Sequence, residues 1–321
     1  MSRFTRNTVM LSKAEVTYGV DPVPTGAEAI LMSNPAFKLV TQNVNRDLVR
    51  PYFGNSEQLA GTKWLEHGGD VELVGSGTVA DAPAWSALIQ ACAMNETIIA
   101  ATRVDYTPVT DLQESVTNYV YKSGVLHKAL GARGKLTINM KQGEIPKLGF
   151  AFLGLYGGVS AAVPSGIDFS AFQVPQVVNN TNSTKLYIGG DVLATGAPAV
   201  TGGAQYPSLG LELDLGLEVP LTALVGGETV DVTDRKLTGK VTLDLTAAQE
   251  VTQEASVLAN TLQAVSFLHG TVAGKKVLVH CPLMQFTNPQ YDDLNGRQLL
   301  TYDLIGVPDG DGNNELRIVL F

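Results

Sequence analysis

Gly134-Lys135-Leu136-Thr137-Ile138-Asn139-Met140 alternates apolar and polar side chains from Lys135 to Met140. Successive side chains of a strand point to opposite faces of a sheet, so this period of two predicts a half-buried β-strand. The same alternation appears at residues 70–74, 240–245 and 275–280, and apolar strand-like runs occupy 148–154 and 299–306. With 33 glycines and 15 prolines punctuating such runs, the sequence predicts a mainly β chain.

Two segments depart from this period and predict helices. In residues 84–94 an apolar stripe has the i, i+3, i+4, i+7 spacing of a helix face, and Pro83 is placed as a helix starter. Residues 255–265 show similar spacing, with Val257 or Leu258 followed by Leu262 and Val265. The stripe of the first segment consists of Trp85, Leu88, Ile89 and Cys92.

The two predicted helices lie in similar surroundings, which suggests an internal repeat. Each follows a glycine turn, an acidic loop and an alternating strand, and each precedes a Gly-Lys strand start, at residues 134–135 and 274–275. The identities are too few to prove duplication. We expect a first β domain with an N-terminal arm at 1–160, a linker or insertion at 161–206, and a second similar β domain at 207–321.

The amino-acid composition argues against several classes of function. The 321 residues are 45% hydrophobic, and 31 acidic against 22 basic residues give a net charge of −9, which opposes tight binding to phosphates. No apolar window approaches the roughly 18 residues of a membrane span or forms a signal peptide, so we expect a protein made and kept in a cytoplasm. In that setting Cys92 and Cys281 are expected to be buried, reduced thiols.

No motif predicts catalysis, a cofactor or a metal site. The run Asp309-Gly310-Asp311-Gly312-Asn313 has alternating oxygen ligands but fails as a calcium loop, because Asn314 and Leu320 stand where Gly and Glu are needed. A solvated turn is the better interpretation. The four histidines lack the spacing of zinc ligands, and no nucleophile elbow, phosphate loop or dinucleotide fingerprint is present.

Three segments carry a resemblance to a known family. Residues 11–26 (with Thr17-Tyr18-Gly19), residues 46–57 (with Arg50-Pro51-Tyr52-Phe53-Gly54) and residues 124–134 resemble, in order and spacing, the tail tube proteins of long-tailed siphophages. The resemblance implies a tail-tube-type β-sandwich or partial barrel with a flanking helix, and no enzyme activity. It also implies that subunit sheets join side by side into rings, and that rings stack into a hollow tube.

The resemblance further implies partners and a location. The chain would bind itself, the tape measure protein, the tail terminator and baseplate or distal tail proteins, while genomic DNA passes through the tube without specific binding. No membrane partner or cofactor is implied. The protein would lie in the virion tail after assembly in the host cytoplasm. A duplicated chain would form a trimer with pseudo-six-fold symmetry, which we favour, whereas a single-copy chain would need a hexamer.

The polar loops 48–63 and 225–236 are the candidates for contacts between rings, although ordinary solvated hairpins would look alike. The candidate contact residues are Arg50, Glu57, Lys63, Glu228, Asp234 and Arg235. Acidic residues on strand faces are the candidates for the lumen, where they would repel DNA at short range. These lumen candidates are Asp70, Glu72 and Asp244, the last beside Thr242.

Two alternatives remain open. A ring-forming baseplate or connector component would share the fold but stop at one ring. An adhesin or carbohydrate-binding β-sandwich module would be a monomer with an aromatic cluster on one sheet, and an aromatic content of 7% does not favour it.

Overall fold

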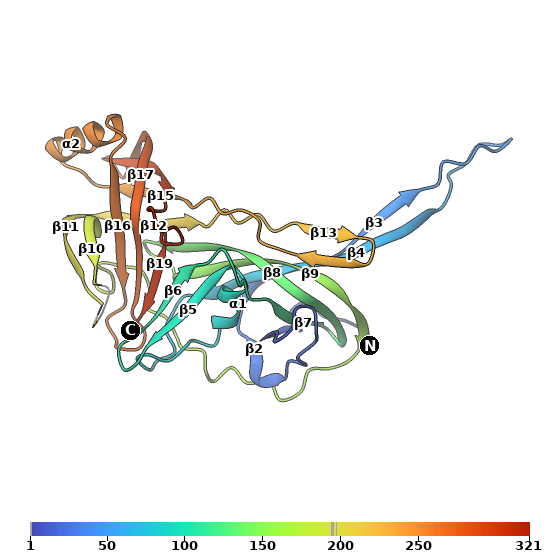
Figure 1. The fold of residues 1–321 in the computed structure, drawn as a ribbon. Coiled ribbons are helices and arrows are strands. Elements are labelled where there is room, and N and C mark those ends of the chain that lie inside the picture. The colour runs from blue at the N-terminus through green and yellow to red at the C-terminus, as the bar shows by residue number, and fades with distance from the viewer. Residues whose placement is uncertain (1, 194–195, 197) are drawn as a thin grey trace.

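Antiparallel strands make up most of the chain in a computed structural model that describes residues 2–193, 196 and 198–321 (Figure 1). The first half contains β1 (Thr8–Ala14), the 3-10 turn Gly26–Glu28, β2 (Ala29–Ile30), β3 (Ser33–Asn45), β4 (Gln58–Glu72), α1 (Ser86–Gln90), β5 (Met94–Ile99), β6 (Arg103–Pro108), β7 (Val116–Lys122), β8 (Val125–Lys141) and β9 (Lys147–Ala161). The second half contains β10 (Leu186–Val192), β11 (Val200–Tyr206), β12 (Ser208–Asp214), β13 (Leu221–Leu224), β14 (Gly227–Val230), β15 (Thr238–Leu243), α2 (Ala247–Leu258), β16 (Leu262–His269), β17 (Val277–Leu294), β18 (Arg297–Gly306) and β19 (Arg317–Leu320).

The predicted fold class is confirmed, since the chain is mainly β with large antiparallel sheets and a flanking helix. The sheets are not closed into a barrel within one chain. Residues 134–140 lie in β8, 148–154 in β9 and 299–306 in β18. The period of two located the strand at 134–140 correctly, and the apolar runs located the other two, although residues 299–302 of β18 are buried on both faces.

Eight strands form one continuous antiparallel run in the order β3-β4-β9-β8-β12-β15-β18-β17. One face of this run is apolar, and its buried side chains join the core under α1. A single registered row illustrates the face, consisting of Val71, Leu148, Ile138, Leu213, Gly239, Leu304 and Phe286. The β8–β12 ladder carries this row from the first half into the second.

The strand pairings of the two halves repeat. The first half has the order β3-β4-β9-β8-β7-β1, and the second has β12-β15-β18-β17-β16-β10. Each matched strand also comes at the same point along its half, with a helix after β4 and after β15. A register shift recurs as well, because three residue steps oppose two between Ser33 and Ala36 and again between Ser208 and Leu211.

The first helix lies where it was predicted, although it spans only five residues, with Trp85, Leu88 and Ile89 buried. The second prediction, at 255–265, was wrong in position, because α2 spans Ala247–Leu258 and residues from Leu262 onward form β16. A capping box between Thr246 and Gln249 begins the helix earlier. Asn260, at φ 54°, follows its end, and Val265 is needed in the sheet core.

Two parts of the chain depart from a simple body of sheets. The β3–β4 hairpin projects away from the rest of the molecule, and almost every residue of β3 is exposed (Figure 1). In the predicted linker, residues 186–206 contain the β10–β11 hairpin, which pairs with β16. Residues 194–195 and 197 of that linker, and residue 1 of the predicted first domain, lie outside the described part of the chain.

Candidate functional site

The polar face of the eight-stranded run is the first candidate site. One row of side chains crosses seven of its strands in unbroken register, each residue opposite the next on a neighbouring strand. Residues opposite each other in antiparallel strands share a face and lie about 5 Å apart. The row consists of Glu72, Lys147, Asn139, Glu212, Lys240, Asp303 and Thr287, so acidic, basic and neutral groups are interspersed.

The charges in this row lie next to opposite charges. Lys141 Nζ lies 2.9 Å from Glu212 Oε1, and this ion pair crosses the β8–β12 ladder that joins the two halves. Both side chains are about two-fifths exposed, so the pair contributes little to stability. Because the bases of this row stand beside acids, the row as described offers no cluster of free cations that could hold a phosphate backbone.

The lumen candidates lie on or beside this face. Glu72 is the first residue of the row, and Asp70 lies one row away, where its Oδ2 accepts a hydrogen bond of 2.7 Å from Asn34 Nδ2. Asp244 follows the end of β15, where its Oδ2 lies 2.5 Å from Arg297 Nη2. The structure thus brings Asp70 and Glu72 onto one face and places Asp244 at its border. Their orientation in an assembly stays a prediction.

The projecting β3–β4 hairpin carries the first group of inter-ring candidates. Arg50 is exposed in the loop at its end, and Glu57 forms an ion pair with Arg46 across the hairpin. Lys63 lies within β4, not in the loop, and its Nζ is 5.8 Å from the centre of the Tyr156 ring. Large apolar side chains at the end of the hairpin are also exposed, namely Val49, Tyr52 and Phe53. Such a surface is typical of a contact with another molecule.

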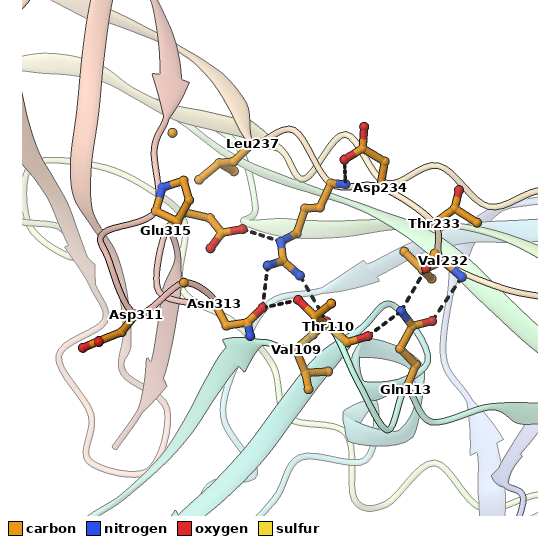
Figure 2. A pocket seen from close by; sticks show the side chains of 14 residues that line it. Val109, Thr110, Gln113, Val232, Thr233, Asp234, Leu237, Asp311, Asn313 and Glu315 are labelled. Carbon is orange, nitrogen blue, oxygen red and sulfur yellow. Dashed lines mark hydrogen bonds and ion pairs between the residues drawn. The ribbon is translucent and has the colours of Figure 1, made fainter.

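The second group of candidates lies on and after the β13–β14 hairpin. Glu228 is exposed in β14, and Asp234 Oδ2 lies 2.6 Å from Lys236 Nζ. The Arg235 side chain is instead only 13% exposed, and its partners Val109, Asn313 and Glu315 line the pocket seen in Figure 2. It forms an ion pair with Glu315 and donates hydrogen bonds to Val109 O at 3.1 Å and to Asn313 Oδ1 at 2.9 Å. A side chain held this way is committed to contacts within its own chain.

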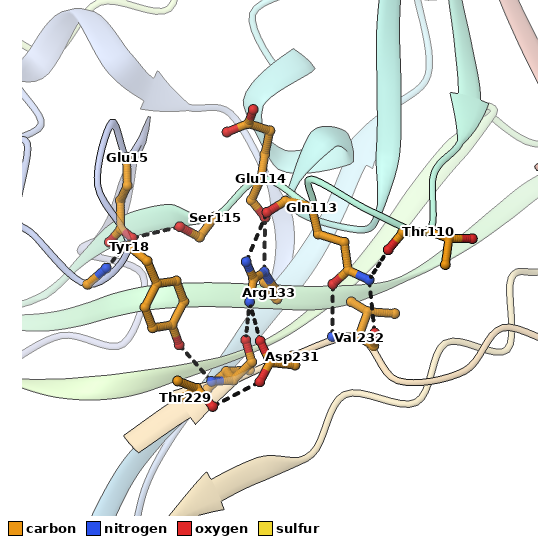
Figure 3. Close-up of polar contacts among 12 residues, drawn as sticks. Glu15, Tyr18, Thr110, Gln113, Glu114, Ser115, Arg133, Thr229, Asp231 and Val232 are labelled. Atoms are coloured by element: carbon orange, nitrogen blue, oxygen red, sulfur yellow. Dashed lines mark hydrogen bonds and ion pairs between the residues drawn. The ribbon is translucent and has the colours of Figure 1, made fainter. Parts of the chain in front are cut away.

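A second arginine ties the halves together beside this point (Figure 3). Arg133 of β8 donates to the carbonyl oxygen of Val230 at 2.6 Å, to that of Gln113 at 2.9 Å and to that of Glu114 at 3.2 Å. It also lies 2.7 Å from Asp231 Oδ1 and 5.0 Å from the centre of the Tyr18 ring. The segment after β14 is thereby fastened to the first half.

Sequence reasoning missed Arg133. Its hydrogen-bond partners lie up to 98 residues away along the chain. No local pattern marks an arginine of this kind, because its role depends on a contact between distant segments.

The described part of the chain offers no metal or thiol chemistry. No three His, Cys, Asp or Glu side chains in it are grouped so as to hold a metal ion. Cys92 and Cys281 are free and buried, as predicted, and burial raises the pKa of both thiols. Residues 309–314 form a turn in which the backbone amide of Asp311 donates to Asp309 Oδ1. Among the described helices, none combines the length and apolar character required to cross a bilayer.

The sequence is similar to a known protein family over most of its length. A family model described as phage tail tube protein matches residues 5–310, which is nearly the entire chain. No curated protein matches the sequence.

Proposed function

Because the chain belongs to the phage tail tube protein family, we propose that it assembles with copies of itself into stacked rings that form the hollow tube of a siphophage tail. It is a structural component of the virion tail and not an enzyme. Genomic DNA would pass through the tube to the host without specific binding.

The observation that carries this proposal is the eight-stranded run with one apolar and one polar face. In the described chain β3 pairs with β4 on one edge, and residues 290–294 of the other end strand, β17, pair with β18 on one edge, so each end strand leaves an edge free. Unpaired strand edges are a liability that proteins remove by covering or pairing them. A ring in which each sheet pairs with the next would pair the edges and leave the polar face around a central channel.

We favour a ring of three chains. The repeated order of strands and the repeated register shift support a tandem duplication, so that each chain would supply two similar units to a pseudo-six-fold ring. Three chains of eight such strands would bring twenty-four strands, which at about 4.8 Å spacing give a barrel about 37 Å across, wider if the strands tilt. Such a barrel would leave a central channel inside its inward-facing side chains. A hexamer of single-copy units remains the alternative.

The β3–β4 hairpin is our candidate for the contact between successive rings. It extends beyond the body of the chain and exposes both charged and large apolar side chains at its end (Figure 1). Arg50 and Glu57 would take part directly, with Lys63 supporting the base of the hairpin. Glu228 and Asp234 would contribute from the β13–β14 side, whereas Arg235, which is largely covered, would hold that loop in place.

The wall of the channel would not bind DNA tightly. A net charge of −9 opposes phosphate binding by the whole chain, and the bases of the polar row stand beside acids. Asp70, Glu72 and Asp244 would add local repulsion.

The remaining parts of the proposal concern partners. In the tail the tube would surround the tape measure protein and end at the tail terminator and at the baseplate or distal tail proteins. Assembly would take place in the host cytoplasm.

Negative-stain electron microscopy of the purified chain at rising concentration tests the proposal. We expect hollow rings or tubes whose end-on class averages show three-fold symmetry with six similar lobes. Rings that never stack would favour the baseplate or connector alternative. A persistent monomer, also in the presence of a tail initiator complex, would contradict self-assembly and favour a binding module.

A further inference from the structure

The strand pairing between the two halves of one chain indicates which strands pair between neighbouring chains. Residues 210–214 of β12 pair antiparallel with residues 137–141 at the end of β8. In the repeated strand order, β12 corresponds to β3 and β8 corresponds to β17. The chain therefore contains one copy of a junction whose second copy lacks a partner.

Each strand of the missing junction has one unpaired edge in the described chain. The last residues of β17, from 288 to 294, are exposed, and 290–294 pair with β18 on one edge only. In the described chain β3 pairs with β4 on one edge, and most of its residues are exposed. An exposed strand edge with unused backbone donors and acceptors recruits another strand.

The face of the sheet on which each side chain lies limits which residues of β17 and β3 can stand opposite each other. Thr301 opposes Thr242 and Gln290, so Gln290, Asp292 and Leu294 share the polar face. On β3 the corresponding polar-face residues are Ala36 and Lys38, which oppose Gly68 and Glu66. Paired residues must share a face, so Asp292 would stand opposite Ala36 or Lys38.

Charge supports the same pairing. Within the chain the junction places Lys141 of β8 beside Glu212 of β12. In the unpaired copy the signs are exchanged, because the acid Asp292 lies on β17 and the base Lys38 lies on β3. The Lys38 side chain is 68% exposed and lies 3.7 Å from Glu66, so its ammonium group is accessible to a second carboxylate.

We propose that the partner of the β17 edge at Gln290–Leu294 is the β3 edge at Pro35–Leu39 of a second copy of this chain, paired antiparallel as β8 is with β12. This inference rests on the proposed ring. It specifies the strand pairing between neighbouring chains, which we call the seam. Each chain offers one edge of each kind, so every copy can pair with two neighbours, and the ring closes where the rotation between copies adds up to a full turn.

Cysteine pairs test the seam in the full chain. Asp292→Cys combined with Ala36→Cys or with Lys38→Cys is treated with dibromobimane, a short thiol-to-thiol linker, under conditions in which rings are seen by microscopy. The native thiols are buried and should stay silent. We expect covalent dimers and a covalent closed trimer from at least one pair, at a yield at least tenfold above that of Asp292→Cys with Phe37→Cys, which face opposite sides of the sheet.

Two controls separate the possible failures. Asn139→Cys with Glu212→Cys probes the ladder inside the chain and should cross-link without raising the mass. Rings without cross-links between copies, while this control succeeds, would overturn the seam and leave the proposed function intact. Absence of any assembly would overturn both.

A charge exchange gives an independent readout. Lys38→Asp and Asp292→Lys should each raise the concentration needed for assembly roughly fivefold, and the double variant should recover most of it. Equal assembly by all three variants would contradict the ion pair across the seam.

Discussion

Replacing Arg133 with alanine should loosen the connection between the two halves. The guanidinium donates to three backbone carbonyls and to Asp231, and the side chain is only 12% exposed. Hydrogen bonds from a charged donor contribute about 1.5–3 kcal/mol each, but water can reach part of this site. Asp231 is 46% exposed, so its ion pair adds little. We expect a loss of about 3–4 kcal/mol in the free energy of unfolding, or roughly 6 °C in Tm.

Urea denaturation at a concentration below assembly measures this loss. Arg297→Ala is a matched control, because Arg297 also pairs with an aspartate but its side chain is 70% exposed. The control should lose less than about 1 kcal/mol. Arg133→Lys should fall between the two, since one ammonium group cannot reach all the carbonyls that the guanidinium fork reaches. Equal losses for Arg133→Ala and Arg297→Ala would refute the reasoning.

Three other predictions follow from the hairpin, the histidines and the thiols. Replacing residues 47–56 with a short Gly-Ser turn should leave the urea midpoint unchanged but shorten tubes in micrographs, since the loop makes few contacts within the chain; tubes of normal length would contradict a role between rings. Burial lowers the pKa of His67 and of His280 to about 4, so the unfolded chain binds protons first as pH falls below about 6.5. Stability should therefore be full at pH 7 and lower by about 2 kcal/mol per histidine at pH 5, and His67→Gln should show a smaller difference in Tm between these pH values. Cys92 and Cys281 should resist a thiol reagent in the native protein and react in urea, and rapid native labelling would contradict their burial.

The sequence predicted the strands well because their signal is local. The alternation over 134–140 can be read from neighbouring residues alone, and so can the apolar run at 299–306. The position of α2 could not be read in this way, because Leu262 and Val265 fit a helical stripe as well as a strand, and only packing against the sheet decides between them. The capping box at Thr246 was the local signal that could have moved the prediction.

The candidate site was predictable only in part. Asp70 and Glu72 were selected because they alternate with apolar residues, which places them correctly on the polar face. The alignment of Glu72 with Glu212 and Lys240 depends on the register between β8 and β12, two strands that are far apart along the chain. Likewise Arg235 looked like a free loop charge until the fold brought Glu315 beside it.

The ladder between β8 and β12 has a consequence for the kinetics of assembly. Because it is made within one chain, its strands meet at a high effective concentration, and that half of the junctions forms during folding whatever the protein concentration. Only the remaining junctions depend on encounters between molecules. A ring of three such chains would nucleate with a third-order dependence on concentration, where six separate units would give a much steeper one. Tubes could then grow at a low concentration of subunits. Stopped-flow light scattering over a concentration series would measure how steeply the nucleation rate depends on protein concentration.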